Sequence, residues 1–243
     1  LILFRSIYEI DKYPTLAVIC FPMGMYVSGI ATTIPSYLSS IAHPNLSIMA
    51  IGNNKEVALS ALPALAHNYK QVILFGHPFF IKELLEEATA RKLRWTGVKV
   101  RTFLCSEGFS EEWRSYVSSL LPGSDPIRDI VSTYGSAELL LIGYETPLTI
   151  LLRRYIQKTS VETGLSRAPE STLFQYDPRL RHICAENGEL LFTSNGSMPL
   201  IRYQLHDRGK LYAMKDLMSI VDTVAIKEEL QVLRWRPWTL PIV

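Results

Sequence analysis

The residues best suited to chemistry in this chain lie at positions 131–138, Val-Ser-Thr-Tyr-Gly-Ser-Ala-Glu. Small and β-branched residues that lead into an aromatic residue and a glycine predict a buried strand ending in a tight turn. Tyr134 offers a flat face on which a base can stack, and Glu138 offers the hard oxygen ligand that magnesium prefers. The stretch therefore suits nucleotide binding. A core tyrosine beside a helix-capping glutamate explains the same residues equally well.

Strand and helix patterns alternate through the first 135 residues and deliver this stretch at the end of a strand. The predicted strands are 16–21, 46–51, 71–75, 98–105 and 127–134, and the predicted helices are 25–41, 54–67, 79–92 and 110–121. Such alternation predicts an α/β fold, a mostly parallel sheet with helices on both faces. The helix at 25–41 is expected to be buried, because it carries no charge.

Three glycine-containing loops follow predicted strands, at residues 76–78, 106–108 and 134–136. Parallel strands end at the same edge of a sheet, and ligands bind at that edge near a topological switch point. The loops therefore predict a pocket at the carboxyl ends of the strands.

The pattern changes after Gly164. A helix at 147–156 comes first, with Arg153 and Arg154 interpreted as a solvated face rather than a phosphate clamp. Short predicted strands then follow at 172–176, 181–185, 190–193 and 200–205, separated by turn residues. The sequence thus predicts an α/β subdomain at 1–163, which contains the nucleotide-binding stretch, and a smaller β-rich subdomain at 164–243.

Composition excludes several classes of protein. Apolar residues make up 48% of the chain and charged residues 20%, which is typical of a globular fold. Lys and Arg total 25 and Asp and Glu total 23, so the chain lacks the excess of positive charge that is typical of nucleic-acid-binding proteins. Cys20, Cys105 and Cys184 are far apart and form no Cys-x-x-Cys pair, which argues against a disulfide framework or a zinc knuckle and predicts a cytoplasmic location.

One long uncharged stretch could in principle cross a membrane. Residues 13–54 contain no Asp, Glu, Lys or Arg, and 15–34 is long enough to cross a bilayer. Prolines and glycines interrupt this run, and no Lys/Arg cluster flanks it, so a buried strand, turn and helix are favoured. The chain begins at Leu1 and ends on an apolar run, from which we expect an internal piece of a longer protein. Its oligomeric state is unknown from the sequence.

Four stretches, taken in order, resemble the adenylate-forming acyl ligases, specifically the branch around phenylacetate–CoA ligase. They are Phe-Pro-Met-Gly at 21–24, Ser-Glu-Gly-Phe-Ser-Glu-Glu-Trp-Arg at 106–114, the stretch 134–147, and the segments 188–193 and 199–207. The third is similar to the family's aromatic-Gly-x-Thr/Ser-Glu motif. The last is similar to its Gly-Glu-Leu strand and Tyr-Arg-Thr-Gly-Asp element.

The resemblance implies roles for particular residues. Tyr134 would stack on adenine, Glu138 would hold the catalytic magnesium, and Asp207 would accept hydrogen bonds from the ribose hydroxyls. Arg202 would steer a carboxylate or phosphate, although a surface salt bridge explains it as well. The remaining nucleotide-binding residues would be Ser106, Glu107, Gly108, Gly135 and Ser136. An apolar pocket for the acid would be walled by Phe21, Met23, Tyr26, Phe75 and Gly76, residues that a plain core also explains.

The implied reaction joins a carboxylic acid, aromatic or fatty, to ATP and releases pyrophosphate. A thiol acceptor such as coenzyme A would then displace AMP from the acyl-adenylate. Ala137 stands where the family has a hydroxyl, and Gln204, Leu205 and His206 replace its Arg-Thr-Gly. His206 is interpreted as a turn residue.

The family's phosphate loop, its Gly-Arg hinge and its C-terminal domain with the catalytic lysine are absent from this sequence. We therefore expect this chain alone to bind AMP or ATP weakly and to lack ligase turnover. Two alternatives remain open: a degenerate family member that serves as a structural or interaction module, and an enzyme that transfers the acyl group to a carrier protein.

Overall fold

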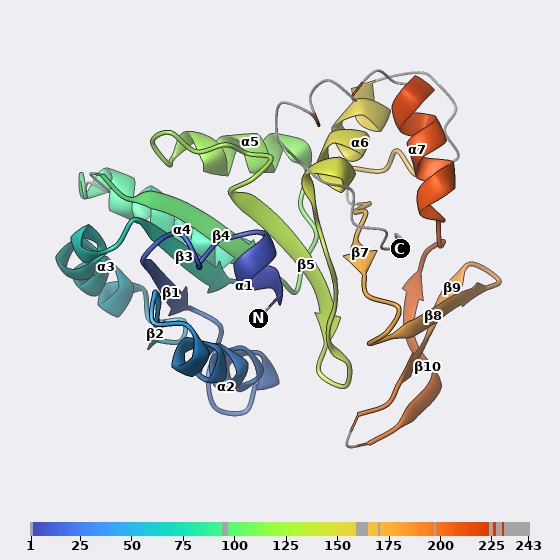
Figure 1. The fold of residues 1–243 in the computed structure, drawn as a ribbon. Helices are drawn as coiled ribbons and strands as arrows, with labels where there is room; N and C mark the ends of the chain where they lie inside the picture. The colour runs from blue at the N-terminus through green and yellow to red at the C-terminus, as the bar shows by residue number, and fades with distance from the viewer. Residues whose placement is uncertain are drawn as a thin grey trace. The chain divides into compact units, whose positions relative to one another are not determined.

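The computed structural model describes residues 2–93, 97–158, 165–169, 171–196 and 198–223, together with residues 226 and 230. They belong to two compact units, Leu1–Ser132 and Thr133–Val243. Strand β5 (Ile130–Ser136) passes from the first unit into the second (Figure 1). The predicted change of pattern at residues 163–164 falls within the second unit.

The first unit alternates strands and helices as the sequence predicts. Its other strands are β1 (Thr15–Ile19), β2 (Leu46–Ala50), β3 (Gln71–Gly76) and β4 (Lys99–Leu104). Its helices are α1 (Ile2–Ser6), α2 (Val27–Ala42), α3 (Lys55–Leu65), the short 3-10 helix η1 (Ala66–Asn68), α4 (Pro78–Ala90) and α5 (Glu111–Ser119). The seven-stranded sheet has the order β2-β1-β3-β4-β5-β6-β7, and neighbours from β2 to β5 pair in parallel. The α/β fold with a mostly parallel sheet is therefore confirmed.

Alternate residues of the parallel strands pack on opposite faces of the sheet. On β1, Leu16 and Val18 join side chains of α3, α4 and α5 in one core cluster. Ala17 and Ile19 join Tyr8 and other residues of the amino-terminal segment in a second cluster. Because both faces are covered, β1 and β3 are nearly continuous apolar runs instead of alternating ones.

Helix α2 is not the buried helix that the sequence predicted. Its buried residues are the small Gly29, Ser36 and Ser39. A Cβ on Gly29 would lie 2.4 Å from the Pro22 carbonyl oxygen, so the helix packs closely through its small residues. The large side chains consequently point outward and are exposed: Val27, Ile30, Ile34, Tyr37, Leu38 and Ile41. Without charged residues to mark the solvent side, the sequence did not reveal which face packs inward.

The second unit contains the antiparallel elements. They are β6 (Leu140–Tyr144), α6 (Pro147–Lys158), β7 (Gln175–Tyr176), β8 (His182–Glu186), β9 (Glu189–Ser194), β10 (Leu200–Arg208) and α7 (Met214–Thr223). Strands β10, β9 and β8 form a separate three-stranded sheet, which confirms the predicted hairpins. The sequence analysis missed β6, α1 and α7, and it predicted a longer β7.

The strand order changes direction at β1. Strand β2 pairs with one side of β1 and β3 with the other. Because crossovers between parallel strands are right-handed, the helices that follow β1 and β3 cover opposite faces of the sheet. The carboxyl ends of β1 and β3 therefore flank the topological switch point, where ligands of open α/β sheets bind. Residues 21–23 follow β1, and Gly76 is the last residue of β3, with His77 directly after it.

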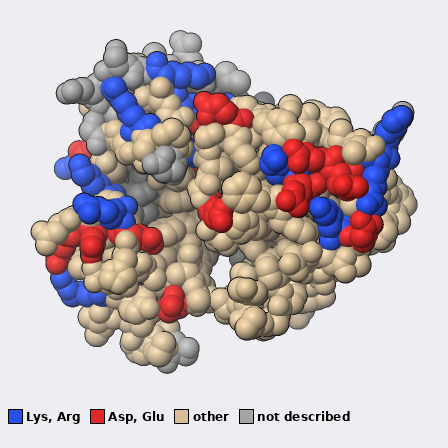
Figure 2. All heavy atoms as spheres, turned by 180° about the vertical axis from the view of Figure 1, so that it is seen from behind, with Lys and Arg blue, Asp and Glu red and all other residues tan. Residues whose placement is uncertain are grey.

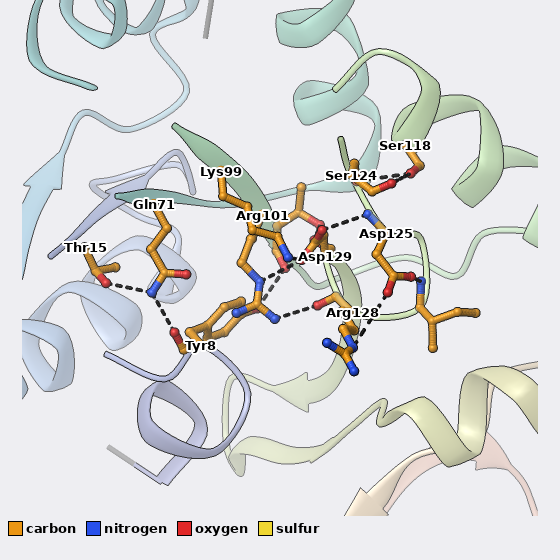
Figure 3. Close-up of polar contacts among 12 residues, drawn as sticks. Tyr8, Thr15, Gln71, Lys99, Arg101, Ser118, Ser124, Asp125, Arg128 and Asp129 are labelled. Carbon is orange, nitrogen blue, oxygen red and sulfur yellow. Dashed lines mark hydrogen bonds and ion pairs between the residues drawn. The ribbon is translucent and has the colours of Figure 1, made fainter. Parts of the chain in front are cut away.

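A buried polar cluster lies at the opposite edge, at the amino ends of the strands (Figure 3). The Asp129 carboxylate, fully buried, lies 3.0 Å from both Lys99 Nζ and Arg101 Nε. The contact with Arg101 is an ion pair that is poorly aligned for a hydrogen bond. The second Asp129 oxygen accepts a hydrogen bond of 2.8 Å from the Asp125 backbone N–H.

Tyr8 joins the amino-terminal segment to this cluster. Its ring lies 4.7 Å from the Arg101 guanidinium, and its hydroxyl donates to the Thr102 carbonyl at 2.8 Å. Gln71 donates to the Tyr8 carbonyl at 2.6 Å and to the Thr15 hydroxyl at 2.8 Å. The cluster thus satisfies polar groups inside the first unit, far along the strands from the carboxyl edge.

The surface carries charges of both signs. In Figure 2 acidic and basic side chains lie interspersed, and over α3 and α4 they form ion pairs such as Arg91 with Glu56 and Lys55 with Glu83. This face therefore lacks a field of one sign. Across the described ranges, none of the helices combines the length and apolar character needed to cross a membrane.

Candidate active site

Two of the three predicted loops make contact at the carboxyl edge of the first unit. His77 follows β3 and Glu107 follows β4, and His77 Nε2 lies 3.3 Å from Glu107 Oε1. The His77 ring also lies 5.8 Å from the ring of Phe79, measured between centroids. Ser106 has a φ of +88°, a left-handed conformation that a non-glycine residue adopts at a cost. Ser106, Glu107 and Gly108 are all exposed, so this loop is accessible to a ligand.

Helix α5 anchors that loop from inside. The Ser110 hydroxyl accepts a hydrogen bond of 3.2 Å from the Trp113 backbone N–H, as the predicted cap requires. Arg114 is fully buried; its Nε lies 3.0 Å from each Glu111 carboxylate oxygen, and its Nη1 donates to the Ile130 carbonyl on β5. Ser110, Glu111 and Arg114 therefore support the start of α5 and its packing against β5.

The residues predicted to wall an acid pocket divide into two groups. Phe21 and Phe75 are buried in the core on the α1 face, and Phe75 stacks on Phe103 with centroids 4.6 Å apart. Met23 is 37% exposed and Tyr26 61% exposed. The plain core proposed as the alternative accounts for Phe21 and Phe75, because odd-numbered positions of β1 and β3 face that cluster.

The close approach of neighbouring segments explains why residue 76 is a glycine. A Cβ at this position would lie 2.8 Å from Ile81 Cδ1 and 3.4 Å from Cys20 Cβ, so the ends of β3 and β1 and the start of α4 meet here. The Cys20 N–H also donates to the Phe75 carbonyl at 2.7 Å. Gly76 therefore permits the tight packing at the topological switch point.

Tyr134 lies in the second unit, near the end of β5. Its ring stacks on Phe174, with centroids 5.6 Å apart and planes inclined by 20°, and meets the edge of Phe192 at 6.0 Å. At most one face is thus left for a base. Burial, and secondarily a hydrogen bond to Asp207, raise the pKa of the Tyr134 hydroxyl above its usual range. A Cβ on Gly135 would lie 2.4 Å from the Leu140 carbonyl oxygen, so only glycine fits the bulge between β5 and β6.

The turn after β5 carries Ser136, Ala137 and Glu138. The Ser136 hydroxyl accepts a hydrogen bond of 3.2 Å from the Leu139 backbone N–H, and it therefore stabilises the turn. Leu140 completes the turn with a φ of +57°. Ala137 and Glu138 are exposed. The described residues contain no group of three or more His, Cys, Asp or Glu placed to hold a metal ion.

Asp207 and Tyr134 are brought together although 73 positions separate them in the sequence. The Tyr134 hydroxyl donates a hydrogen bond to Asp207 Oδ2. On β10 the pairing changes register between Gln204, opposite Leu191, and Arg208, opposite Glu189. The intervening segment bulges and presents Asp207 at the surface.

His206 explains how the bulge turns. Its φ is +65°, in the left-handed region that glycine adopts most easily. This is the position at which the resembled motif has glycine, the residue that adopts such a φ most easily. The expectation of a turn residue agrees with this geometry.

Arg202 forms a surface ion pair across the hairpin. Its Nη2 lies 2.6 Å from Glu186 Oε2, and this contact raises the pKa of the Arg202 guanidinium. Its backbone N–H donates to the Thr193 hydroxyl at 3.0 Å, and its φ is +53°. The described contacts therefore match the salt-bridge alternative.

The environment of Arg153 differs from the sequence-based prediction. The sequence predicts a solvated face, but the Arg153 side chain is only 3% exposed, so this prediction is wrong. Its Nη1 lies 3.6 Å from the equally buried Glu145 carboxylate, and its Nη2 donates to the Pro169 carbonyl at 2.6 Å. Helical periodicity placed Arg153 opposite the apolar stripe, but it did not reveal that residues 145 and 169 cover that side. The carboxylate of Glu145 in the Gly-Tyr-Glu-Thr-Pro stretch was the available signal.

The candidate residues thus fall in both units. Ser106, Glu107, Gly108 and the proposed acid-pocket residues belong to the first, and Tyr134, Gly135, Ser136, Glu138, Arg202 and Asp207 belong to the second. Within the second unit, Tyr134 and Asp207 meet directly. Within the first, the 76–78 and 106–108 loops meet through His77 and Glu107.

The fold is similar to solved structures of 2-hydroxyisobutyryl-CoA ligase. One is an open conformation in complex with 2-HIB-AMP and CoA, with 13% identity, 82% of this chain and 41% of that chain covered, and a TM-score of 0.56. Another is a postadenylation state in complex with 2-HIB-AMP, with 12% identity, coverages of 87% and 42%, and a TM-score of 0.57. At such identity the likeness establishes the fold alone, and the chain spans about two fifths of those structures. No family model matches the sequence, and no curated protein matches it.

Proposed function

We propose that this chain is the part of an AMP-forming acid–thiol ligase that binds the adenosine of ATP and AMP. The observation that carries the proposal is the contact between Tyr134 and Asp207, two residues that the resemblance assigns to adenine and ribose. The ligase-like fold supports it. An exposed carboxylate beside a partly buried aromatic ring suits a nucleoside, because a base stacks and a vicinal diol donates hydrogen bonds.

The reaction needs no protein nucleophile. A carboxylate would attack the α-phosphorus of ATP with loss of pyrophosphate, and a thiol, that of coenzyme A, would displace AMP from the acyl-adenylate. Catalysis of this kind depends on positioning and on neutralising charge. Tyr134 and Asp207 would hold the adenosine.

Glu138 is proposed to ligate magnesium. An exposed carboxylate at the turn after β5 fits such a role, because magnesium is commonly held by one or two carboxylates together with substrate phosphates and water. When bound, the ion would neutralise phosphate charge.

The acid is proposed to enter at the topological switch point between β1 and β3. Met23 and Gly76 flank this point, and the side chains that approach Gly76 most closely, Ile81 and Cys20, are apolar. An aromatic or fatty acid suits that environment, as the resemblance to the phenylacetate–CoA ligase branch suggests. The solved neighbour was captured with a hydroxy-acyl adenylate, which widens the acids worth testing.

A second candidate is a degenerate module without catalysis. Ala137 offers no hydroxyl to a phosphate, and His206 occupies a backbone position suited to glycine. Acyl transfer to a carrier protein in place of coenzyme A is a third. ATP–pyrophosphate exchange with a panel of acids, measured on a longer protein that contains this chain, separates the ligases from the module.

The direct test on this chain is nucleotide binding to Asp207→Ala. Removing the carboxylate leaves ribose hydroxyls without an acceptor, which costs about 1–3 kcal/mol, so AMP should bind roughly ten- to a hundredfold more weakly. Asp216→Ala, an exposed aspartate on α7, is the matched control and should bind AMP like the wild type. Equal calorimetric titrations for Asp207→Ala and wild type would remove Asp207 from the site. We also expect no ligase turnover from this chain alone.

A further inference from the structure

The carboxylate of Asp207 is already half engaged in this structure. Its Oδ2 accepts the hydrogen bond from the Tyr134 hydroxyl, and among the described residues this is the only side-chain donor recorded for it. A carboxylate grips a vicinal diol by accepting one hydroxyl on each oxygen. Each carboxylate oxygen offers about two acceptor sites, so Oδ2 keeps one for a ligand and Oδ1 keeps both, which makes Oδ2 the poorer acceptor.

The Tyr134 hydroxyl is held in place by its surroundings. Phe174 stacks on the ring and Phe192 meets it edge to face, with centroids 5.6 and 6.0 Å away. The close approach at Gly135 fixes the backbone beside it. Burial raises the pKa of the Tyr134 hydroxyl, so at neutral pH the group keeps its proton and acts as a donor.

Asp207 is fixed from the other side. The β10 bulge, with His206 in the left-handed region, sets the direction in which the side chain leaves the strand. The two elements thus bring the Tyr134 hydroxyl and the Asp207 carboxylate together, and Asp207 itself is exposed. An ordered Tyr–Asp pair with one open oxygen is a more selective acceptor than a free carboxylate.

We propose that Tyr134 is a positioning residue that reserves Asp207 Oδ2, so that Asp207 recognises chiefly one of the two ribose hydroxyls through Oδ1. This inference rests on the proposed nucleotide site. It assigns to the Tyr134 hydroxyl a role separate from the stacking role of its ring. A ligand's second hydroxyl would have to share Oδ2 with Tyr134 and would gain little.

The test compares AMP, 2′-deoxy-AMP and 3′-deoxy-AMP by ligand-observed NMR titration of the chain. In the wild type, the deoxynucleotide that lacks the hydroxyl bound by Oδ1 should bind about tenfold more weakly than AMP, because it loses one hydrogen bond to a charged group. The deoxynucleotide that lacks the other hydroxyl should differ from AMP by less than about threefold. Tyr134→Phe keeps the ring and frees Oδ2. The affinities of the two deoxynucleotides should then differ by less than about threefold.

Two further variants control the result. Tyr144→Phe alters another partly buried tyrosine of the same unit and should keep the wild-type pattern. Asp207→Asn retains an amide oxygen for the Tyr134 hydroxyl but replaces Oδ1 by a donor. The affinity of Asp207→Asn for AMP should then equal the affinity of the wild type for the deoxynucleotide that lacks the hydroxyl bound by Oδ1. Circular dichroism checks that each variant is folded.

The outcomes separate the two proposals. If AMP does not bind the folded wild type at millimolar concentration, the proposed nucleotide site is wrong and this inference is wrong with it. If AMP binds but both deoxynucleotides are equally weak in the wild type, Tyr134 does not reserve Oδ2, and the nucleotide site still stands. The same conclusion follows if Tyr134→Phe leaves the ratio of the two affinities unchanged.

Discussion

Two aspartates in this chain contact very different surroundings. Asp129 is fully buried at the amino ends of the strands, between Lys99, Arg101 and a backbone N–H. Asp207 is exposed on a bulged strand and accepts a hydrogen bond from a neutral hydroxyl. The first carboxylate has its charge balanced inside the fold, and the second keeps charge and one oxygen available to a ligand. Burial and partners, more than residue type, therefore separate a stabilising aspartate from a binding one.

The strongest test of this contrast is Asp129→Ala. It leaves Arg101 buried without its counter-charge, which should lower the free energy of unfolding by about 3–5 kcal/mol. Urea unfolding followed by circular dichroism measures the change. Asp11→Ala removes an exposed ion pair with Arg5 and should leave the urea midpoint nearly unchanged. The contrast would fail if Asp207→Ala destabilised the chain as much as Asp129→Ala.

A second test breaks the support of Tyr134. Gly135→Ala forces a methyl group against the Leu140 carbonyl oxygen, 2.4 Å away, and overpacking of this kind costs about 1–3 kcal/mol. Because Tyr134 precedes this position, AMP affinity should fall together with stability. Gly196→Ala has no heavy atom nearer than 3.9 Å and is the matched control. A fully stable Gly135→Ala protein would show that the bulge can move.

His206→Gly, next to Asp207, should increase stability where the two preceding changes reduce it. Glycine adopts the φ of +65° without the penalty paid by a side chain, so unfolding should become about 1 kcal/mol less favourable. His182→Gly on β8, where the backbone is ordinary strand, should destabilise by about 0.5–1 kcal/mol. Thermal melts of the two variants should therefore move in opposite directions. A lower melting temperature for His206→Gly would contradict a strained backbone.

The smallest expected effect concerns alkaline pH. Burial is the main cause of the raised pKa of Tyr8 beside Asp129, so the folded state holds this proton more tightly than the unfolded state. Its contribution to stability is complete below the unfolded pKa of about 10 and declines as pH rises above that value. Urea midpoints between about pH 9 and 11 should therefore fall less steeply in Tyr8→Phe than in wild type. Parallel slopes would show that Tyr8 does not titrate with unfolding.

The sequence by itself determined most elements of the first unit. Largely apolar runs marked β1 and β3, because strands covered on both faces need few polar positions. Asn54 and Ser110 marked two helix starts, and their side chains accept hydrogen bonds from Val57 and Trp113 as expected. The same local logic missed β6, which pairs with β5 across a short turn and with the distant β7, and it made β7 too long.

For the candidate site, the sequence supplied residue types and order, and the tertiary structure decided their surroundings. Motif spacing singled out Tyr134 and Asp207, but only folding showed that the two side chains are joined by a hydrogen bond. Conversely, Arg153 and Phe75 looked available in the sequence and are enclosed by packing. Hydrophobic periodicity records which side of an element is apolar, whereas burial depends on what other segments place against it.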